Sequence, residues 1–566
     1  MMVKVKKIWN SIFNFINKTN PFFIALILFL FFIVSGIVAM KFIVLGADMG
    51  ELCNNPLRVL TGELPYRDFW LLFSPGEVYV PALIYKIFGI NTDILINTFI
   101  IISALTAVFS FYVGKYLLKT NAAAFIFSLL FYFLSVISRY EGPGYNHLYL
   151  TFLLLSFFFI TKHFNTNNLN HLFFAGLFAG IAFFFRVYEV GGAILGFTAA
   201  LIIHNYFIKN ELRISLKNLI IFILGIMVIP ALTLLIFYNI APKMLSEIVF
   251  ESVKNGTSMN LPMFAYLQDF KPEFMADWNG LVEQGKIVLI LKLLVKLSWL
   301  ICAILQIILV WIGVLFLFLY IKTKPDKMEL SITLILFLWS LFSYPKGLGR
   351  SSLSHFAPST CPMALFICFA TINVLRKKNI SFGKLEKIIT MSGTIVIIIL
   401  LFSIMSSYSK QLNLRDKYIY TIPTERGTIR HKEKIYIDGI DSALKIIYRQ
   451  TKPDDYIFVT PWDAPPFYVL TGRRNPTYYD SMNDLLVRPS DEKQRQLCKD
   501  LIEHNTKLII HDPNTGYEPE QRFYVACKII QEFIVKNYTF KGVYGKYLIY
   551  EKKDSLIIGD KIYRLN

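Results

Sequence analysis

The chain has 566 residues, of which 55% are hydrophobic and 16% aromatic, and its mean hydropathy is +0.50. Soluble proteins are less apolar and rarely contain many uncharged runs long enough to cross a bilayer, so these values exclude a soluble globular protein. The formal charge of +19 does not indicate nucleic-acid binding, because the Lys and Arg residues of a membrane protein gather in the loops that stay on one side.

Apolar runs long enough, or nearly long enough, to cross a bilayer occur about eleven times along the chain. They lie at about 21–45, 94–114, 122–138, 146–161, 171–186, 190–208, 218–240, 298–320, 329–344, 353–374 and 386–407. Residues 69–90 are also apolar, but Pro75, Gly76 and Glu77 interrupt them, so we expect this segment to lie along the membrane surface. Residues 286–320 are too long for one span, and the lysines in their first third indicate an interfacial helix before a crossing. The sequence therefore predicts a polytopic α-helical membrane protein.

Basic residues gather in alternate loops, and this sets the predicted orientation. Four lysines precede the first span, and every second loop after it is basic. These residues are Lys4, Lys6, Lys7 and Lys18; Lys115 and Lys119; Lys162; Lys209, Arg213 and Lys217; Lys322, Lys324 and Lys327; and Arg376, Lys377, Lys378 and Lys384. We expect these segments to be cytoplasmic, which places the C-terminus outside. The Lys-, Ile- and Asn-rich composition favours a bacterium and hence its plasma membrane.

The character of the chain changes after Ser409. "DDYIFVTP" and "TKLIIHD" are typical of short buried strands, whereas "DEKQRQLCKDLIEHN" and "RFYVACKIIQEFIVKNY" are amphipathic at helical spacing. Alternating helices and strands predict a compact extracytoplasmic α/β domain over 409–566. Residues 1–408 are predicted to form the membrane domain, with a first external loop at 46–93 that carries interfacial helices.

The first external loop begins with two acids, Asp48 and Glu51. Their spacing is that of a capping box at the start of a surface helix through "GELCNNPLRVL". An acid at the start of a helix can also face a cavity, so the capping and catalytic interpretations are compatible.

The wider loop, "GADMGELCNNPLRVLTGELPYRDFWLLFSPGEVYVPALIYKIFGIN", resembles the first external loop of the membrane-embedded GT-C glycosyltransferases. The resemblance is closest to the branch that contains protein O-mannosyltransferases and lipid A aminoarabinose transferases. That family has an acid after the first span, a helix, a "G-x-x-P-Y-x-D-F" stretch, "P-G", and an apolar segment that ends in "FG". Here these features are Asp48, Gly62 to Phe69, Pro75-Gly76 and Phe88-Gly89. Many mannosyltransferases pair the Asp with an adjacent Glu, whereas this chain has Met49 next and Glu51 later.

The resemblance implies a GT-C fold and transfer of a sugar from a polyprenyl-phosphate donor to an acceptor hydroxyl on the outer side of the membrane. The hydroxyl is a poor nucleophile, so a carboxylate must take its proton as it attacks, and one displacement inverts the anomeric centre. Asp48 is the expected general base. The other expected catalytic residues are Glu51 and Glu141, and the expected substrate-binding residues are Tyr66, Arg67, Asp68 and Arg139.

The departing lipid phosphate is an anion and needs cations rather than a proton. "FFFRVYEVGG" and "YPKGLGRSSLSHFAP" place basic residues at the predicted outer ends of spans, against the positive-inside trend. Such side chains often reach only to lipid headgroups. Arg suits bidentate phosphate contact, however, and the second stretch is similar to an "R-x-D-x-x-H" pattern of bacterial relatives, with Ser352 in place of the acid. We therefore predict that the donor phosphate is bound by Arg350, Arg186, His355 and Lys346.

Several motifs are absent, which narrows the function further. The sequence has no P-loop, no G-x-G-x-x-G and no His/Cys metal cluster, so it predicts a lipid-linked rather than a nucleotide-linked donor, and no cofactor or divalent metal. The acceptor is left open among lipid, glycan and protein. A lipid-linked saccharide transporter or flippase is an alternative, but such proteins carry ionisable residues near the bilayer midplane and these spans are nearly free of them. A membrane sensor is the third interpretation.

Overall fold

The computed structural model describes residues 11, 13–40, 47–71, 74–137, 148–208, 212–251, 304, 308–349, 353–376, 384–413, 420–431, 433–460, 467–479, 482, 485–486, 489–515, 519–553, 555–558 and 561–564. For some terminal residues of these segments only the backbone is described. The expected acid and arginine of the second external loop, Glu141 and Arg139, lie outside the described residues, as does Arg350.

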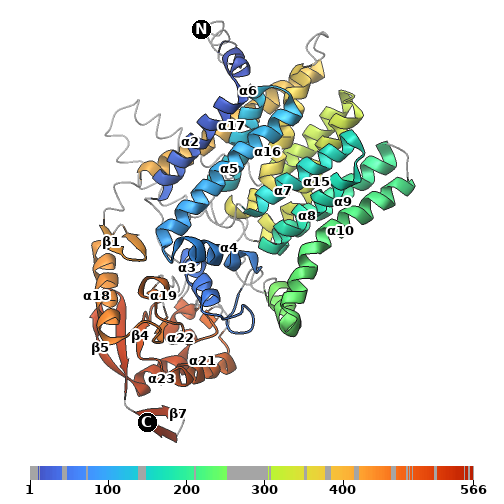
Figure 1. The fold of residues 1–566 in the computed structure, drawn as a ribbon. Coiled ribbons are helices and arrows are strands. Elements are labelled where there is room, and N and C mark those ends of the chain that lie inside the picture. Colours follow the sequence, from blue (N-terminus) through green and yellow to red (C-terminus); the bar gives the residue numbers. More distant parts are fainter. Residues whose placement is uncertain are drawn as a thin grey trace, which may run out of the picture. The chain divides into compact units, whose positions relative to one another are not determined.

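Each of the eleven apolar runs of the sequence overlaps a helix of the structure (Figure 1). Seven helices of the described residues are long and apolar enough to cross a membrane, and the helices at Asn121–Ser135, Leu169–Phe185 and Ile308–Lys322 are apolar but shorter. The helices that overlap the apolar runs include α2 (Pro21–Met40), α5 (Thr92–Leu118), α6 (Asn121–Tyr132), α7 (Leu148–Thr166), α8 (Leu169–Phe185), α9 (Val187–Ile203), α10 (Leu212–Ile236), α15 (Lys327–Gly349), α16 (Leu353–Arg376) and α17 (Lys384–Asn413). The predicted polytopic helical architecture is confirmed.

Glycines allow two pairs of these helices to pack backbone against backbone. A Cβ atom at Gly176 of α8 would lie 2.1 Å from the carbonyl oxygen of Phe222 on α10. A Cβ atom at Gly192 of α9 would lie 2.5 Å from the carbonyl oxygen of Phe342 on α15, and one at Gly196 would lie 2.6 Å from that of Leu338. Small residues at such spacing are the usual means of close helix contact in membranes. Figure 1 shows α7, α8, α9, α10 and α15 side by side.

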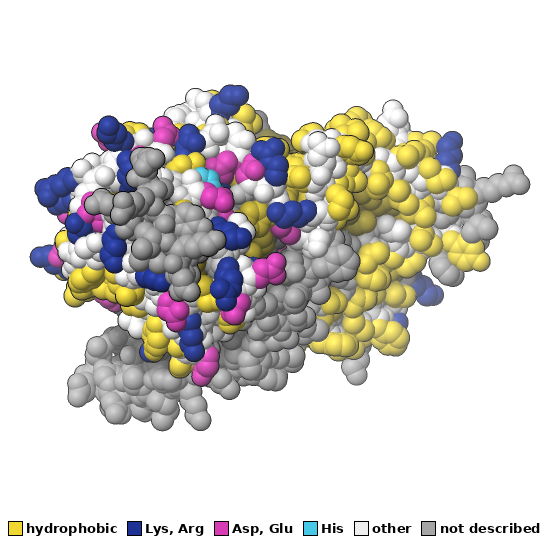
Figure 2. Space-filling model, turned by 90° about the horizontal axis from the view of Figure 1, so that it is seen from below, with side chains coloured by type: hydrophobic (Ala, Val, Ile, Leu, Met, Phe, Trp, Pro, Cys, Tyr) yellow, Lys and Arg dark blue, Asp and Glu magenta, His cyan; other side chains and the backbone are white. Residues whose placement is uncertain are grey.

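The helices expose large apolar side chains, as lipid contact requires. Leu235 and Ile236 of α10 are 72% and 73% exposed, and Trp311 is 65% exposed. Hydrophobic side chains cover much of one part of the surface in Figure 2, whereas Lys, Arg, Asp and Glu alternate on another part. A surface of the first kind is stable only against lipid or another apolar partner.

The chain divides into two compact units that do not follow its order. The first consists of Met1–Val38, Phe99–Tyr238 and Met259–Leu412, and the second consists of Ala39–Thr98, Asn239–Ser258 and Asn413–Asn566. The contacts thus group the first loop with the C-terminal segment, whereas the sequence division at 408/409 followed hydropathy along the chain.

Two short helices build the first loop. α3 (Ala47–Leu60) contains the helix that the sequence predicted through "GELCNNPLRVL". α4 (Gly76–Phe88) has 13 residues, which extend roughly 20 Å at 1.5 Å per residue and fall short of the ~30 Å apolar core of a bilayer. The expectation that residues 69–90 do not form a crossing helix agrees with this length.

The C-terminal segment folds around a four-stranded sheet of order β3-β4-β6-β5. β3 (Ile457–Val459) and β4 (Leu508–His511) are parallel, and β6 (Tyr547–Lys552) runs antiparallel to β4 and to β5 (Tyr538–Tyr544). Both parallel strands are fully buried, as their continuous apolar sequences predict. The predicted α/β domain is therefore confirmed, with an antiparallel hairpin added at its end.

Helices cover this sheet and bury one apolar side each. α18 (Lys434–Gln450) packs on β5 and β6 and buries Ile437, Ile440, Leu444 and Ile447, which recur at helical spacing. α21 (Asp491–Glu503) begins at Ser490, whose side chain caps the backbone N–H of Lys493. The predicted helix over "RFYVACKIIQEFIVKNY" forms as two pieces, α22 (Phe523–Ala526) and α23 (Lys528–Asn537). The smaller helices are α19 (Phe467–Thr471) and α11 (Ala241–Leu245), and two further hairpins pair β1 (Tyr420–Thr424) with β2 (Gly427–His431) and β7 (Ser555–Ile558) with β8 (Lys561–Arg564).

Candidate functional site

The two acids of the first loop lie in the first five residues of α3. The helix begins at Ala47, so Asp48 lies inside the helix rather than before it, and Glu51 follows one turn later. Acidic residues in a first turn are favoured by the helix dipole, which stabilises negative charge there. Their side chains, and that of His355 in the first turn of α16, lie outside the described residues.

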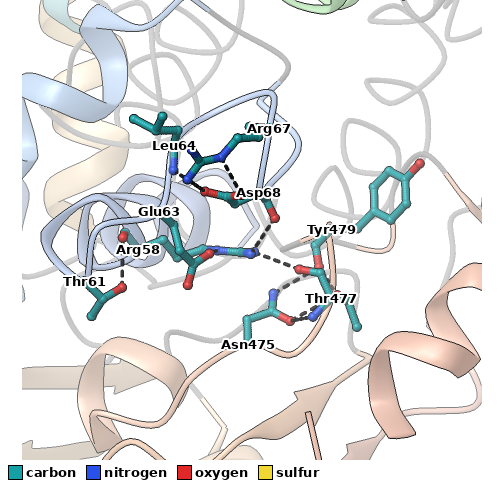
Figure 3. A network of polar contacts seen from close by, with 9 residues as sticks. All are labelled: Arg58, Thr61, Glu63, Leu64, Arg67, Asp68, Asn475, Thr477 and Tyr479. Carbon is teal, nitrogen blue, oxygen red and sulfur yellow. Dashed lines mark hydrogen bonds and ion pairs between the residues drawn. The ribbon is translucent and has the colours of Figure 1, made fainter. Parts of the chain in front are cut away.

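Arg58, near the end of α3, forms hydrogen bonds with other parts of the second unit (Figure 3). Its Nε atom donates to Glu63 at 2.6 Å, Nη2 donates to the Asp68 carbonyl at 3.0 Å, and Nη1 donates to the Thr477 carbonyl at 2.9 Å. The guanidinium also lies 4.8 Å over the ring of Phe69. Arg58 is buried, so these bonds determine where α3, and hence its acidic first turn, is held against the C-terminal segment.

The expected substrate-binding residues Tyr66, Arg67 and Asp68 form a tight turn. Tyr66 has a φ of 66° and is fully buried, and its N–H donates to the Phe69 carbonyl at 2.8 Å. Asp68 accepts from the Leu64 N–H at 2.8 Å and from Arg67 at 2.6 and 2.8 Å. The bond from Arg67 lowers the pKa of the Asp68 carboxyl. In this structure the three residues stabilise the loop, and contact with substrate remains a prediction.

A buried cluster of acids and tyrosines lies beside this turn. The Tyr478 hydroxyl donates to Glu247 Oε1 at 2.6 Å and lies 3.1 Å from the Tyr66 carbonyl oxygen. Burial, with the charges of Glu247 and Glu77 nearby, holds the pKa of Tyr66 well above its usual value. The ammonium of Lys243 lies 4.0 Å from Glu247 Oε1 and 4.1 Å over the Tyr478 ring.

Arg58, Glu247 and Tyr478 were not predicted from the sequence as site residues, because partners of each lie far away in the chain. Glu247 comes shortly after α11, a short helix that has a proline in its first turn and follows a long apolar run. That proline is the one local sign that the chain turns there. Nothing in the sequence near Tyr478 or Arg58 indicates which residues they contact.

In the first unit, Arg186 separates two helices. α8 ends at Phe185 and α9 begins at Val187, and Arg186 between them has an extended backbone with φ −149° and ψ 97°. The side chain of Arg186 is 7% exposed. It therefore places a guanidinium beside the positive end of α9, where an anion is favoured.

Lys346 of α15 and Arg186 converge on one carboxylate. Glu189, in the first turn of α9, presents its Oε1 atom 3.9 Å from Arg186 Nη1 and 3.7 Å from Lys346 Nζ. The close packing of α9 on α15 at Gly192 and Gly196 brings the two helices together here. The Lys346 ammonium also lies 5.4 Å over the Tyr188 ring, and its side chain is 34% exposed. The structure thus unites two of the four predicted phosphate ligands.

Glu189 was not among the predicted site residues, and its position suggests what the cluster can do. Two cations, Arg186 and Lys346, approach one carboxylate oxygen in a mostly desolvated setting. Arg and Lys in such a setting bind a phosphate more strongly than they would in water. In the described part of the chain no group of three or more His, Cys, Asp and Glu residues is arranged to hold a metal ion.

Comparison of the whole chain with known proteins finds likeness in structure alone. No protein-family model and no curated protein sequence matches it. The apo structure of ArnT from Cupriavidus metallidurans matches with a TM-score of 0.51 and 10% identity over 93% of this chain and 97% of that one. ArnT bound to undecaprenyl phosphate gives 0.48 and 12% over 94% and 97%, and the apo oligosaccharyltransferase of Archaeoglobus fulgidus gives 0.47 and 11% over 94% and 74%.

The likeness to apo ArnT shows the class of fold. The chain is a polytopic membrane protein with the GT-C fold and a C-terminal α/β domain, as the sequence predicted. Apo ArnT has this fold, and the chain matches it over nearly its whole length. At 10% identity this likeness concerns the fold alone.

Proposed function

We propose that the protein is a glycosyltransferase that moves a sugar from a polyprenyl-phosphate donor to an acceptor hydroxyl on the extracytoplasmic face of a bacterial plasma membrane. The single observation that supports it most is the convergence of Arg186 and Lys346 on Glu189 at a break between two membrane helices. A transporter needs charge along a path, whereas this charge is gathered at one helix end.

The fold adds support, since ArnT has the same fold and has also been crystallised with undecaprenyl phosphate. A polyprenyl phosphate presents its charged group beside the membrane and its chain within it. Arg186 and Lys346 are suited to such a ligand because both lie at the ends of membrane helices. Their charged groups converge there on Glu189. Arg350 and His355 are proposed as further phosphate ligands.

The proposed reaction is a single displacement at the anomeric carbon of the donor. The acceptor oxygen forms a bond to C1 as the bond from C1 to the phosphate oxygen breaks, and the configuration at C1 inverts. Asp48 takes the proton of the acceptor hydroxyl, and the carrier leaves as a phosphate anion whose charge the cations stabilise. Glu51 and Glu141 are proposed to orient the acceptor, with Tyr66, Arg67, Asp68 and Arg139 as substrate contacts.

The experiment that tests this function measures donor consumption by the full chain in lipid nanodiscs, over a panel of polyprenyl-phosphate sugars. Wild type is expected to consume one donor, and Asp48→Asn is expected to lose activity by roughly a hundredfold or more while its thermal stability is kept. Asp438→Asn, which removes an exposed acid of α18, is the matched control and is expected to keep full activity.

Full activity in Asp48→Asn would show that Asp48 is not the base and would direct the search to Glu51 and Glu141. Movement of the lipid-linked sugar across the membrane without consumption would contradict the transferase and favour the flippase.

A further inference from the structure

Two cavities of the second unit meet at a pair of arginines. The first has a volume of about 160 Å³ and lies between α3 and the C-terminal segment, where Arg58, Glu63, Asp454 and Arg474 are among its lining residues. The second has a volume of about 970 Å³ and lies between the β1–β2 hairpin and α18. Arg426 and Arg473 line both cavities.

Arg473 is held rigidly and is almost completely buried. Its Nε atom donates to Thr451 Oγ1 at 2.8 Å, and Nη1 and Nη2 donate to the carbonyl oxygens of Thr471 and Thr451 at 2.5 Å. The residue is 4% exposed. A guanidinium has five N–H donors, so two donors remain beyond these three bonds. Burial lowers the pKa of Arg473, and the charge of Arg426 adds to this effect.

Arg426 lies at the turn of the β1–β2 hairpin, and the fold holds that turn in place. Its carbonyl accepts from the Thr92 N–H at 2.8 Å, and the neighbouring Thr428 hydroxyl donates to Asp93 at 2.8 Å. The guanidinium lies against Gly472, where a Cβ atom would be 2.7 Å from Nη1. Because Gly472 has a φ of +69°, a glycine is needed there for the backbone and for the approach of Arg426.

The acids that line the cavities leave these two arginines without a carboxylate. In the smaller cavity Glu63 pairs with Arg58 at 2.6 Å, and Asp454 pairs with Arg474 at 3.3 Å. In the larger cavity Asp441 pairs with Lys445, and the remaining acid, Glu425, is exposed. Among the described residues, no carboxylate lies within ion-pair distance of either Arg426 or Arg473. Asp455 acts on Arg473 electrostatically, but its carboxylate is paired with Lys507 at 2.8 Å. Two like charges are thus held together at a cavity wall with no described carboxylate in direct contact.

An aromatic side chain completes the wall of the larger cavity. Tyr448 of α18 is 48% exposed, and its ring lies 5.2 Å from the Arg473 guanidinium. Its hydroxyl donates to the Leu470 carbonyl at 2.9 Å, which fixes the ring at the cavity edge. Exposed aromatic faces bind the C–H faces of sugar rings, and a volume of this size accommodates one or two sugar units.

We propose that Arg426 and Arg473 form an oxyanion-binding site for a saccharide that carries a carboxylate or a phosphate, with the sugar ring against Tyr448. Arg recognises both oxyanions through the same paired N–H donors, so the shared chemistry defines the ligand class. Such a site would bind the acceptor of the transfer reaction, and that role rests on the proposed function. Binding of the anion itself is independent of transfer.

The test measures binding of glucuronate, glucose 6-phosphate and glucose to the full chain in nanodiscs by ligand-observed NMR, with empty nanodiscs subtracted. Both anions are expected to bind with a dissociation constant on the order of 1 mM at low salt, and more weakly as salt is raised. Glucose, which has the ring without the charge, is expected to bind at least roughly tenfold more weakly.

Two variants give the decisive comparison. Arg426→Gln removes the charge but keeps a polar side chain, and is expected to weaken binding of both anions by roughly tenfold or more. Arg449→Gln removes the same charge from an exposed position of α18 that lines neither cavity, and is expected to bind as wild type does. Arg473→Gln is expected to lose binding as well, but its three internal bonds make Arg426→Gln the variant on which the conclusion depends.

Three results would overturn the proposal. The first is that Arg426→Gln binds the anions as tightly as Arg449→Gln does, and the second is that glucose binds as well as glucuronate. The third is that neither anion binds wild type at a ligand concentration of roughly ten times the expected dissociation constant. Donor consumption measured on the same samples separates this site from the proposed function. Anion binding that Arg426→Gln loses would support the site whether or not a donor is consumed, and donor consumption without anion binding would support the transferase and overturn the site.

Discussion

The ammonium of Lys346 on α15 lies 3.7 Å from the Oε1 atom of Glu189 on α9. Arg186 approaches the same oxygen at 3.9 Å, so the two cations share this carboxylate. Taking charged groups out of water costs free energy, so a buried ionic cluster of this kind is weak evidence of a contribution to stability. A lipid-linked phosphate is the ligand that we propose for this one.

Replacement of Lys346 by Gln should affect donor use rather than folding. The side chain is about one-third exposed, so its loss leaves Glu189 paired with Arg186. We expect kcat/KM for the donor to fall roughly 10- to 100-fold, the usual effect of losing one charge-assisted contact to phosphate. Lys322→Gln, at an exposed position in contact with Phe318, is the control, and equal losses in the two variants would argue against a phosphate site at Lys346.

The adjacent glycines 191 and 192 offer a matched pair for testing how α9 and α15 pack. A Cβ atom at Gly192 would lie 2.5 Å from the Phe342 carbonyl oxygen, whereas one at Gly191 would meet nothing within 4 Å. Gly192→Ala is expected to cost about 2 kcal/mol through overpacking and to lower both the melting temperature and donor affinity. Gly191→Ala is expected to lower neither, because its Cβ meets no neighbour and Ala favours a helix over Gly, and a similar loss in both variants would contradict the close packing at Gly192.

Arg58 should matter more for local stability than the neighbouring Arg67. Arg58 is buried with three hydrogen-bond acceptors, so we expect Arg58→Ala to lower the opening free energy of residues 58–69 by roughly 3 kcal/mol in hydrogen exchange. The side chain of Arg67 is 51% exposed, and Arg67→Ala is expected to cost at most about 1 kcal/mol. Faster exchange in the second variant than in the first would contradict the arrangement in Figure 3.

The stability of the C-terminal sheet should fall as the pH is lowered. His511 of β4 is fully buried, with Nδ1 2.9 Å from the Thr460 hydroxyl, and burial lowers its pKa from 6.5 to about 4. Below pH 6.5 the unfolded chain binds a proton at this histidine while the folded chain does not. Stability is therefore complete above pH 6.5 and is lost progressively down to about pH 4, by on the order of 3 kcal/mol.

Hydrogen exchange of β4 peptides in the full chain at pH 7 and pH 5, corrected for intrinsic rates, measures this loss. His511→Asn should flatten the dependence on pH, whereas His504→Asn, at an exposed position after α21, should leave it unchanged. An unchanged slope in His511→Asn would assign the effect to another group.

The sequence by itself determined the features that depend on composition and local periodicity. Long apolar runs must be helical in a bilayer because no water is available to their backbone, so the membrane helices were predictable one by one. The strands around Phe458 and Ile509 and the amphipathic helix at 491–503 were predictable for the same local reason. The loop pattern from Asp48 to Gly89 also indicated the fold class, and the likeness to ArnT agrees with it.

Only the tertiary structure decided which distant residues meet. Glu189 and Lys346 face each other because glycines let α9 and α15 approach, and Arg426 reaches Arg473 because a hairpin turn is held by the start of α5. The packing also buries Tyr66, a candidate substrate contact by its motif, beside Tyr478. Such contacts depend on the packing of several elements at once, whereas hydropathy and spacing report only on neighbours along the chain.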